Sequence, residues 1–121
     1  MLKLLLDGTF PIHLSRRLKD EGMNVERLIV VGRATETYIT DRLSREDDAV
    51  FVTEDPGRKT LALENRGPVI ISLVPQALPL EERLEPWAGA LASFAARRPP
   101  GRLFKILEDG QMIRVPLETV R

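Results

Sequence analysis

The sequence predicts an α/β fold of three layers, in which helices cover both faces of a mostly parallel β-sheet and a β-hairpin forms the C-terminal end. Short apolar runs, typical of buried parallel strands, alternate along the chain with longer stretches whose apolar residues recur at helical spacing. Near the end, an Asp-Gly pair separates two further segments, which indicates a hairpin over residues 102–117. A chain of 121 residues organised in this way fits one domain, residues 1–121.

Four apolar segments are the predicted strands that precede the hairpin. Residues 2–6 and 49–53 each end directly before carboxylates, Asp7 in the first case and Glu54-Asp55 in the second. The two other segments are residues 24–31 and 69–74. Because the runs are largely apolar, we expect strands that are buried on both faces and joined by right-handed crossovers.

Helices are expected between these strands. Residues 10–21 place Leu14 and Leu18 one turn apart on one face. The next helix should take Thr35 as its N-cap and carry Ile39 on its apolar face. Both helices can therefore cover the sheet with one apolar side.

The second half of the chain contains a short and a long predicted helix. Residues 56–66 form the short one, and the long one follows Pro79. Pro86 should kink the long helix or restart it. Trp87 lies at helical spacing with other apolar residues, so it is expected in the core or in a dimer interface, and residues 97–101 read as a linker.

The hairpin has a turn pair that favours a two-residue loop. Asp109-Gly110 is the preferred pair for a type I′ turn. The resulting register pairs Glu108 with Gln111, Ile106 with Ile113, Phe104 with Val115 and Lys105 with Arg114. The apolar pairs are expected to face the core, whereas Lys105 and Arg114 are expected to face the solvent or an anion.

Composition excludes several classes of protein. The chain has 18 Lys and Arg against 18 Asp and Glu, so its formal net charge is zero and no bulk field attracts nucleic acid or membrane. It has no cysteine, which suits a reducing compartment. No segment reaches membrane-spanning length, and the first apolar run is too short for a signal peptide. We therefore expect a soluble cytoplasmic protein.

Carboxylates follow two of the predicted strands at the point where each strand ends. Asp7 and Asp55 would meet at one edge of the sheet if the first and third strands are neighbours, and Glu36 begins a helix at the same edge. Three such oxygen ligands suit a hard cation such as Mg²⁺. Acids at strand ends and helix starts also serve as caps and dipole partners, and spacing alone favours that structural role.

The neighbours of Asp55 differ in where their side chains should point. Side chains alternate along a strand, so Thr53 should lie on the same side as Asp55 and orient a water or ligand. Glu54 should point to the other side, where it cannot easily share one ion with Asp55. Glu54, Thr53 and Thr9 are therefore supporting candidates only.

Four strings along the chain resemble, in order, the motifs of the small PIN-like domains. They are residues 4–11 (LLLDGTFP), 34–39 (ATETYI), 50–55 (VFVTED) and 67–71 (GPVII), which are similar to the family's L-L-D-E-N-L-P, A-S-D-x-x-I, V-L-V-T-x-D and G-V-I-x-L. The final hairpin also has a counterpart in the family. The resemblance covers nearly the whole chain and implies a PIN-like, Rossmann-like fold.

The resemblance also implies an activity, a cofactor and partners. PIN nucleases cleave RNA phosphodiesters with metal ions, and many PIN-like domains are the toxin of a pair with a small helix-turn-helix antitoxin. Carried over by position, Asp7, Glu36 and Asp55 would be catalytic acids that hold one or two Mg²⁺ or Mn²⁺ ions. The expected partners are thus RNA, an antitoxin and a second copy of the chain.

Any one of the basic residues is more commonly part of an ordinary solvated surface than of a binding site. The candidates for contacts to the RNA backbone are Arg16, Arg17, Arg58, Arg97, Arg98 and Arg102. Arg58 lies nearest the proposed site. His13, in the first turn of its helix, is expected to be an exposed helix residue.

The chain departs from the family at two of its acidic motifs. Gly8-Thr9 stands where the family has Glu-Asn, Gly57 replaces a second acid, and Arg58 replaces an aromatic residue. These changes motivate a second hypothesis, a non-catalytic PIN-like module that binds an antitoxin, RNA or itself. A phospho-receiver domain, a third class, would need an acid pair after the first strand and a lysine after the fifth, and the chain has neither.

Overall fold

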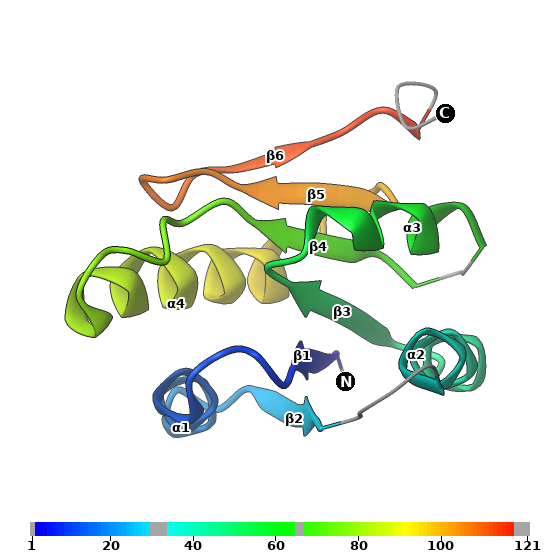
Figure 1. Ribbon diagram of the computed structural model, residues 1–121, viewed down its shortest axis with the longest axis horizontal. Helices are drawn as coiled ribbons and strands as arrows, with labels where there is room; N and C mark the ends of the chain where they lie inside the picture. Colours follow the sequence, from blue (N-terminus) through cyan, green and yellow to red (C-terminus); the bar gives the residue numbers. More distant parts are fainter. Residues whose placement is uncertain (1, 30–33, 65–66, 118–121) are drawn as a thin grey trace.

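A computed structural model, which describes residues 2–29, 34–64 and 67–117, shows a six-stranded sheet in the order β2-β1-β3-β4-β5-β6 (Figure 1). The strands are β1 (Lys3–Asp7), β2 (Asn24–Leu28), β3 (Ala49–Thr53), β4 (Val69–Ser72), β5 (Leu103–Ile106) and β6 (Met112–Arg114). The helices are α1 (Ile12–Asp20), α2 (Ala34–Arg45), α3 (Leu61–Glu64) and α4 (Leu80–Arg97), with a 3₁₀ helix η1 (Pro56–Thr60) before α3. None of the described helices is long and apolar enough to cross a membrane.

The strand order confirms the predicted three-layer, Rossmann-like fold. Every neighbouring pair of strands is parallel except β5 with β6. β1 lies between β2 and β3, so the first and third strands are neighbours, as the candidate site requires. The carboxyl ends of these two strands therefore meet at one edge of the sheet.

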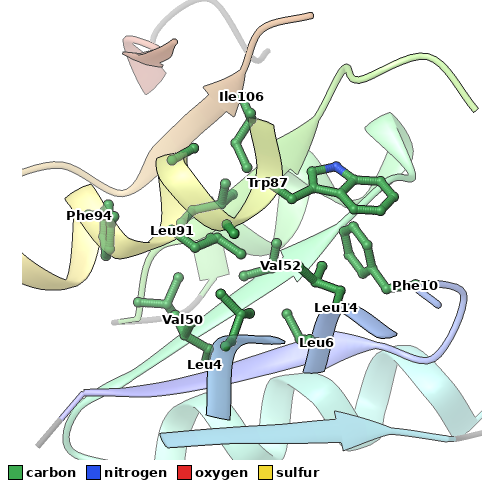
Figure 2. Packing of buried hydrophobic residues seen from close by; sticks show 14 of the residues in the cluster. Leu4, Leu6, Phe10, Leu14, Val50, Val52, Trp87, Leu91, Phe94 and Ile106 are labelled. Atoms are coloured by element: carbon green, nitrogen blue, oxygen red, sulfur yellow. The ribbon is translucent and has the colours of Figure 1, made fainter. Parts of the chain in front are cut away.

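Apolar side chains alternate between two cores, one on each face of the sheet. Leu4 and Leu6 of β1 and Val50 and Val52 of β3 pack with α1 and α4, whereas α2 and α3 cover the other face. Figure 2 shows the first core, where the edge of Phe10 meets the ring of Trp87 with centroids 5.2 Å apart. The middle strands are thus buried on both sides, which explains their nearly continuous apolar sequence.

The prediction that Trp87 lies in the core is confirmed. Its side chain is fully buried, and its Nε1 donates a hydrogen bond of 2.7 Å to Oγ of Ser72 at the end of β4. The same Oγ accepts a hydrogen bond from the Val74 backbone N–H. One serine thus satisfies the indole that anchors α4 on the sheet.

Several element boundaries differ from the prediction. Thr35 lies inside α2 and is not its N-cap, because the helix already includes Ala34. The segment from Pro56 forms a 3₁₀ helix before α3, and residues 65–66 fall outside the described part. β2 ends at Leu28 and β4 at Ser72, each earlier than predicted; residues 30 and 31 of the predicted second strand also lie outside the described part.

Pro86 does not restart α4. The helix is continuous from Leu80 to Arg97, with Pro86 inside it. A proline removes one backbone donor, and the buried apolar face that includes Trp87 and Leu91 outweighs this loss. The helix ends at Arg97, and its C-cap Arg98 takes the left-handed conformation, so Arg97 belongs to the helix rather than to a linker.

The predicted hairpin register was wrong by one residue. The observed pairs are Phe104 with Arg114, Lys105 with Ile113 and Ile106 with Met112. A type I′ turn needs positive φ at both central residues, and of Asp109 and Gly110 only Gly110 has it. The loop therefore has three residues between Leu107 and Gln111, with the Gly110 N–H donating to the Leu107 carbonyl.

The register shift exchanges the faces of β6. Ile113, predicted to be in the core, is 38% exposed, while Arg114 moves to the face that carries Phe104. Val115 and Leu117 pack against the opposite core. At position 114 the hairpin thus presents a cation to the face covered by α4, next to the apolar Met112.

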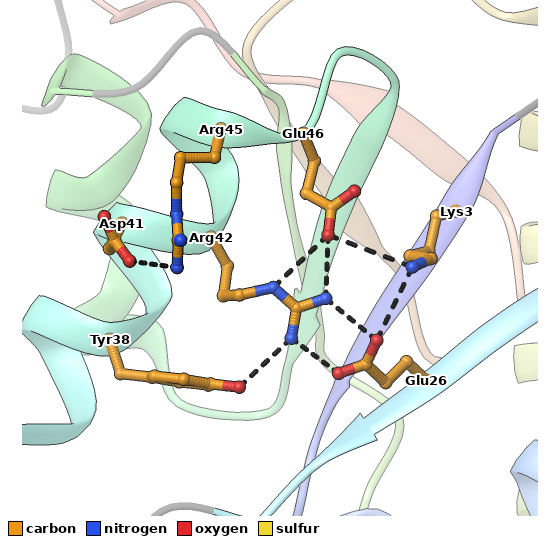
Figure 3. Close-up of polar contacts among 7 residues, drawn as sticks. All are labelled: Lys3, Glu26, Tyr38, Asp41, Arg42, Arg45 and Glu46. Atoms are coloured by element: carbon orange, nitrogen blue, oxygen red, sulfur yellow. Dashed lines mark hydrogen bonds and ion pairs between the residues drawn. The ribbon is translucent and has the colours of Figure 1, made fainter.

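An arginine-centred network ties α2 to the edge of the sheet (Figure 3). Nη2 of Arg42 lies 2.8 Å from Oε1 of Glu26 on β2 and 2.8 Å from Oε1 of Glu46 after the helix. Nζ of Lys3 lies 3.6 Å from Glu26 and 3.8 Å from Glu46. The hydrogen bonds from Arg42 lower the pKa of both carboxyl groups.

These lowered pKa values predict a stability that decreases in acid. A carboxyl whose pKa is lowered on folding stabilises the fold above its unfolded pKa, and this contribution disappears as the pH falls through the folded value. We expect the Arg42→Met variant to lose less stability between neutral pH and about pH 3 than the wild type, because Lys3 alone then lowers the pKa values of Glu26 and Glu46. Urea unfolding at a series of pH values measures this slope.

A matched control for the network is Arg45→Met. Arg45 lies on the same helix and pairs with the exposed Asp41. This variant should keep the pH dependence of the wild type. Equal slopes in wild type and Arg42→Met would contradict a stabilising role for the network.

Candidate functional site

A buried hydroxyl joins the two strand ends at the candidate site. Oγ1 of Thr53 donates a hydrogen bond of 2.7 Å to Oδ2 of Asp7 and accepts one of 3.1 Å from the Asp55 backbone N–H. Thr53 is fully buried, and both of its hydrogen-bonding functions are used. The side chain therefore fixes the end of β3 against the end of β1.

Asp55 caps the 3₁₀ helix that follows β3. Its Oδ1 accepts a hydrogen bond of 2.9 Å from the Gly57 N–H, and Pro56 occupies the first position of η1. This is the structural role that strand-end acids often take. One oxygen of the predicted metal ligand is thus already engaged within the chain.

Arg58 lies between two of the three predicted metal ligands. Its Nη1 is 3.9 Å from Oε2 of Glu36, and its Nε is 3.8 Å from Oδ2 of Asp55. Glu36 comes from the first turn of α2, whereas Arg58 follows Asp55 by three residues, about one turn of a 3₁₀ helix. The Arg58 side chain is 23% exposed, against 54% for Glu36 and 59% for Asp55.

The three predicted ligands do not form a metal-binding group in this arrangement. Asp7 accepts a hydrogen bond from Thr53, while Glu36 and Asp55 face the guanidinium of the arginine described above. Within the described part of the chain, no three His, Cys, Asp or Glu side chains are placed to hold a metal ion. The donor set therefore does not fit Mg²⁺ or Mn²⁺ without movement of Arg58, and the metal role of these acids stays a prediction.

Two glycines occupy positions where the PIN-like motifs have acids, and other atoms of the chain lie close to each of them. A Cβ on Gly8 would lie 2.7 Å from the Leu28 carbonyl oxygen, a distance that real Cβ atoms do not show. A Cβ on Gly57 would lie 3.1 Å from Oδ1 of Asp55. An acid at position 8 thus requires a shift of the backbone where β2 ends.

Glu54 points to the face opposite Asp55, as the alternation of the strand predicts. Burial raises the pKa of Glu54, and the nearby charge of Asp7 raises it further. The Gln76 amide and the Arg83 guanidinium lower it in part. Arg83 in turn lies over the Trp87 ring, with 5.5 Å between its Cζ and the ring centroid. Sequence reasoning missed Gln76 and Arg83, although Arg83 precedes Trp87 by about one helical turn.

The remaining candidate residues lie outside this group. Arg17 pairs with Glu21 and with Glu85, whereas Thr9 and Arg16 are exposed. His13 is exposed in the first turn of α1, as expected. The structure therefore brings together Asp7, Thr53 and Asp55 directly, and joins Glu36 to them through Arg58.

Comparisons with known proteins give no match at the level of sequence or structure. No family model matches the chain, no curated protein matches it, and no solved structure matches it. The fold class thus rests on the architecture described above. The resemblance to PIN-like domains rests on the sequence motifs and their order alone, and it stays a prediction.

The bond between Thr53 and Asp7 predicts a measurable coupling. Thr53→Val conserves volume and removes the hydroxyl, so it should lower the free energy of unfolding by about 1–3 kcal/mol. The loss should be smaller in the Asp7→Ala background, with a coupling of roughly 0.5–3 kcal/mol in a double-mutant cycle. Urea unfolding of the four proteins measures both quantities.

The control for this cycle is Asp20→Ala, at the end of α1. Asp20 is an exposed acid away from the strand ends. The effects of Thr53→Val and Asp20→Ala should add. Additive effects of Thr53→Val and Asp7→Ala would instead show that the hydrogen bond does not stabilise the strand ends.

Proposed function

We propose that this chain is a PIN-like domain that works as a non-catalytic binding module, in which Arg58 supplies the positive charge among the acids. The observation that carries this proposal is the position of its guanidinium, 3.9 Å from Glu36 and 3.8 Å from Asp55. The resemblance makes both carboxylates metal ligands. A guanidinium between them provides the counter-charge that an ion would otherwise bring.

The glycines at the altered motifs support the same proposal. Gly8 replaces an acid at a position where a side chain would collide with the Leu28 carbonyl. The Gly57 N–H donates the capping hydrogen bond to Asp55, and a side chain at position 57 would press on the same carboxylate. Both replacements fit local packing that does not depend on a metal.

A protein partner fits the surface better than RNA does. Arg58 and Arg17, two of the arginines expected to contact phosphate, are each engaged by carboxylates of the chain itself. Phosphate contacts supply most of the affinity of proteins for RNA, and a formal net charge of zero adds no long-range attraction. The small helix-turn-helix antitoxin that the resemblance implies is therefore the preferred partner.

The hydrogen-bonded link from Asp7 through Thr53 to Asp55 favours a second candidate, the metal-dependent ribonuclease that the resemblance implies. In this candidate, Asp7, Glu36 and Asp55 would hold Mg²⁺ or Mn²⁺, and the bound ion would supply an activated water for phosphodiester hydrolysis. Arg58 would first have to leave the two carboxylates. No hydrolytic step is therefore assigned to the present arrangement.

Removal of Arg58 separates the two candidates. Arg58→Ala leaves Glu36 and Asp55 without their counter-charge, so its affinity for Mn²⁺ in isothermal titration calorimetry should exceed that of the wild type by roughly tenfold or more. The wild type should leave a labelled single-stranded RNA intact with Mg²⁺ or Mn²⁺. Arg16→Ala, an exposed arginine of α1, is the control and should behave as the wild type. Cleavage by the wild type that Asp55→Asn abolishes would establish the ribonuclease instead.

Partner binding has its own test. Where a neighbouring gene encodes a small helix-turn-helix protein, its co-expression with this chain should give a complex that co-purifies. The complex should persist in the Asp7→Asn/Asp55→Asn variant, because binding does not use the acids as metal ligands. Loss of the complex in a variant that remains folded would contradict this proposal.

A further inference from the structure

A hollow lies between α4 and the C-terminal hairpin, on the face opposite α2 and α3. We call it the α4–hairpin hollow and define it by Gly89, Phe94 and Arg97 of α4 and by Phe104, Met112 and Arg114 of the hairpin. Its volume is about 570 Å³, within the range of small-molecule sites. In Figure 1 the hairpin forms the edge of the sheet beyond α4.

At each end of the hollow, α4 and the hairpin are in direct contact. Near the hairpin turn, a Cβ on Gly110 would lie 3.0 Å from Cα of Pro86, so the turn rests directly on α4. At the other end, the rings of Phe94 and Phe104 meet edge to face with centroids 5.1 Å apart. The space between these contacts is therefore bounded by packed parts of the fold, α4 and the hairpin, together with residues 99 and 100 of the segment that joins them.

Gly89 keeps one wall of the hollow open. It lies inside α4, where glycine costs roughly 0.5–1 kcal/mol relative to alanine. A Cβ at this position would meet no atom within 4 Å, so close packing does not require the glycine. Gly89 is thus unfavourable in the helix, and close packing does not explain it. Its position beside the hollow indicates that the space there must stay free.

Two arginines at the hollow have no carboxylate partner among the residues that the structure describes. Within the described ranges, neither Arg97 nor Arg114 takes part in an ion pair, although Arg42, Arg58 and Arg98 each do. The Arg114 side chain runs beside Gly101, where a Cβ would lie 2.7 Å from its Cδ. A guanidinium binds carboxylate or phosphate through two parallel hydrogen bonds, so each of these arginines can bind an anionic group at the hollow.

We propose that the α4–hairpin hollow binds a small amphipathic anion. Its apolar body would lie against Phe94, Phe104 and Met112, and its carboxylate or phosphate group would reach Arg97 and Arg114. Aromatic and apolar walls with a few placed polar groups are the usual composition of a ligand site. The site is separate from the acidic strand ends and does not rest on the function proposed above.

Three naphthalene compounds of similar shape test the proposal. 1-Naphthoate and 1-naphthyl phosphate carry the two anionic groups, whereas 1-naphthamide is neutral. Amide chemical shifts followed by NMR should change at the hollow, and the tighter of the two anions identifies the preferred group. The affinity of the neutral amide should be lower than that of the anions by roughly tenfold or more, since a hydrogen bond to a charged group contributes about that factor.

Variants test separately the contribution of the two arginines and that of the free space beside Gly89. Arg97→Gln/Arg114→Gln should weaken both anions at least tenfold and leave the amide unchanged. Gly89→Leu should block all three compounds while urea unfolding shows that stability is kept, because leucine favours a helix. Gly89→Ala, with a smaller side chain, should weaken binding less, and Arg16→Gln should change nothing.

Three results would overturn the proposal. They are no saturable binding of either anion, equal affinity for the anions and the amide, and undiminished binding by a folded Gly89→Leu variant.

Discussion

The parallel pairing of β1 with β3 determines which groups meet at the carboxyl end of the sheet. Both strands are buried on both faces, so their side chains can be polar only where the strands end. Thr53 lies at that point, fully buried, and its hydroxyl must find partners inside the protein. Asp7 accepts a hydrogen bond from this hydroxyl, and the turn to η1 is folded so that the Asp55 N–H donates to the hydroxyl oxygen. The position of Asp55, and with it that of Arg58, follows from this one buried group.

Charge at these strand ends is balanced within the chain. Arg58 neutralises two carboxylates from different elements, as Arg42 does at the opposite side of α2 with Glu26 and Glu46. The two arrangements differ in exposure, since the Arg42 side chain is 12% exposed and its partners lie within hydrogen-bonding distance. The looser geometry around Arg58 makes it the more readily displaced of the two cations. A protein partner that brings its own charge to this surface would compete with a weak ion pair and not with a strong one.

Much of the fold could be predicted because apolar periodicity is a local property of the sequence. The apolar runs before Asp7 and Asp55, the Leu14–Leu18 stripe and the burial of Trp87 all follow from it. The hairpin register could not be predicted, since Asp109-Gly110 suits loops of two or three residues and the contact between Gly110 and Pro86 is visible only in three dimensions. The three acids were placed near one edge by topology, but the ion pairs of Arg58 depend on how tightly η1 turns after Asp55. The α4–hairpin hollow was missed for the same reason as the register, because Arg114 was assigned to the wrong face.

The shortness of β6 has a consequence for self-association. The strand has three residues and ends two positions before Pro116, whereas β2 at the opposite edge has five. A sheet edge can recruit strands from other chains through its unpaired backbone groups, and short strands or proline reduce that tendency. When the protein is concentrated or partly unfolded, edge-to-edge pairing between molecules is therefore expected at β2 rather than at β6. Engineering against aggregation would begin there, with a charged residue or a proline in β2, and would leave the hairpin untouched.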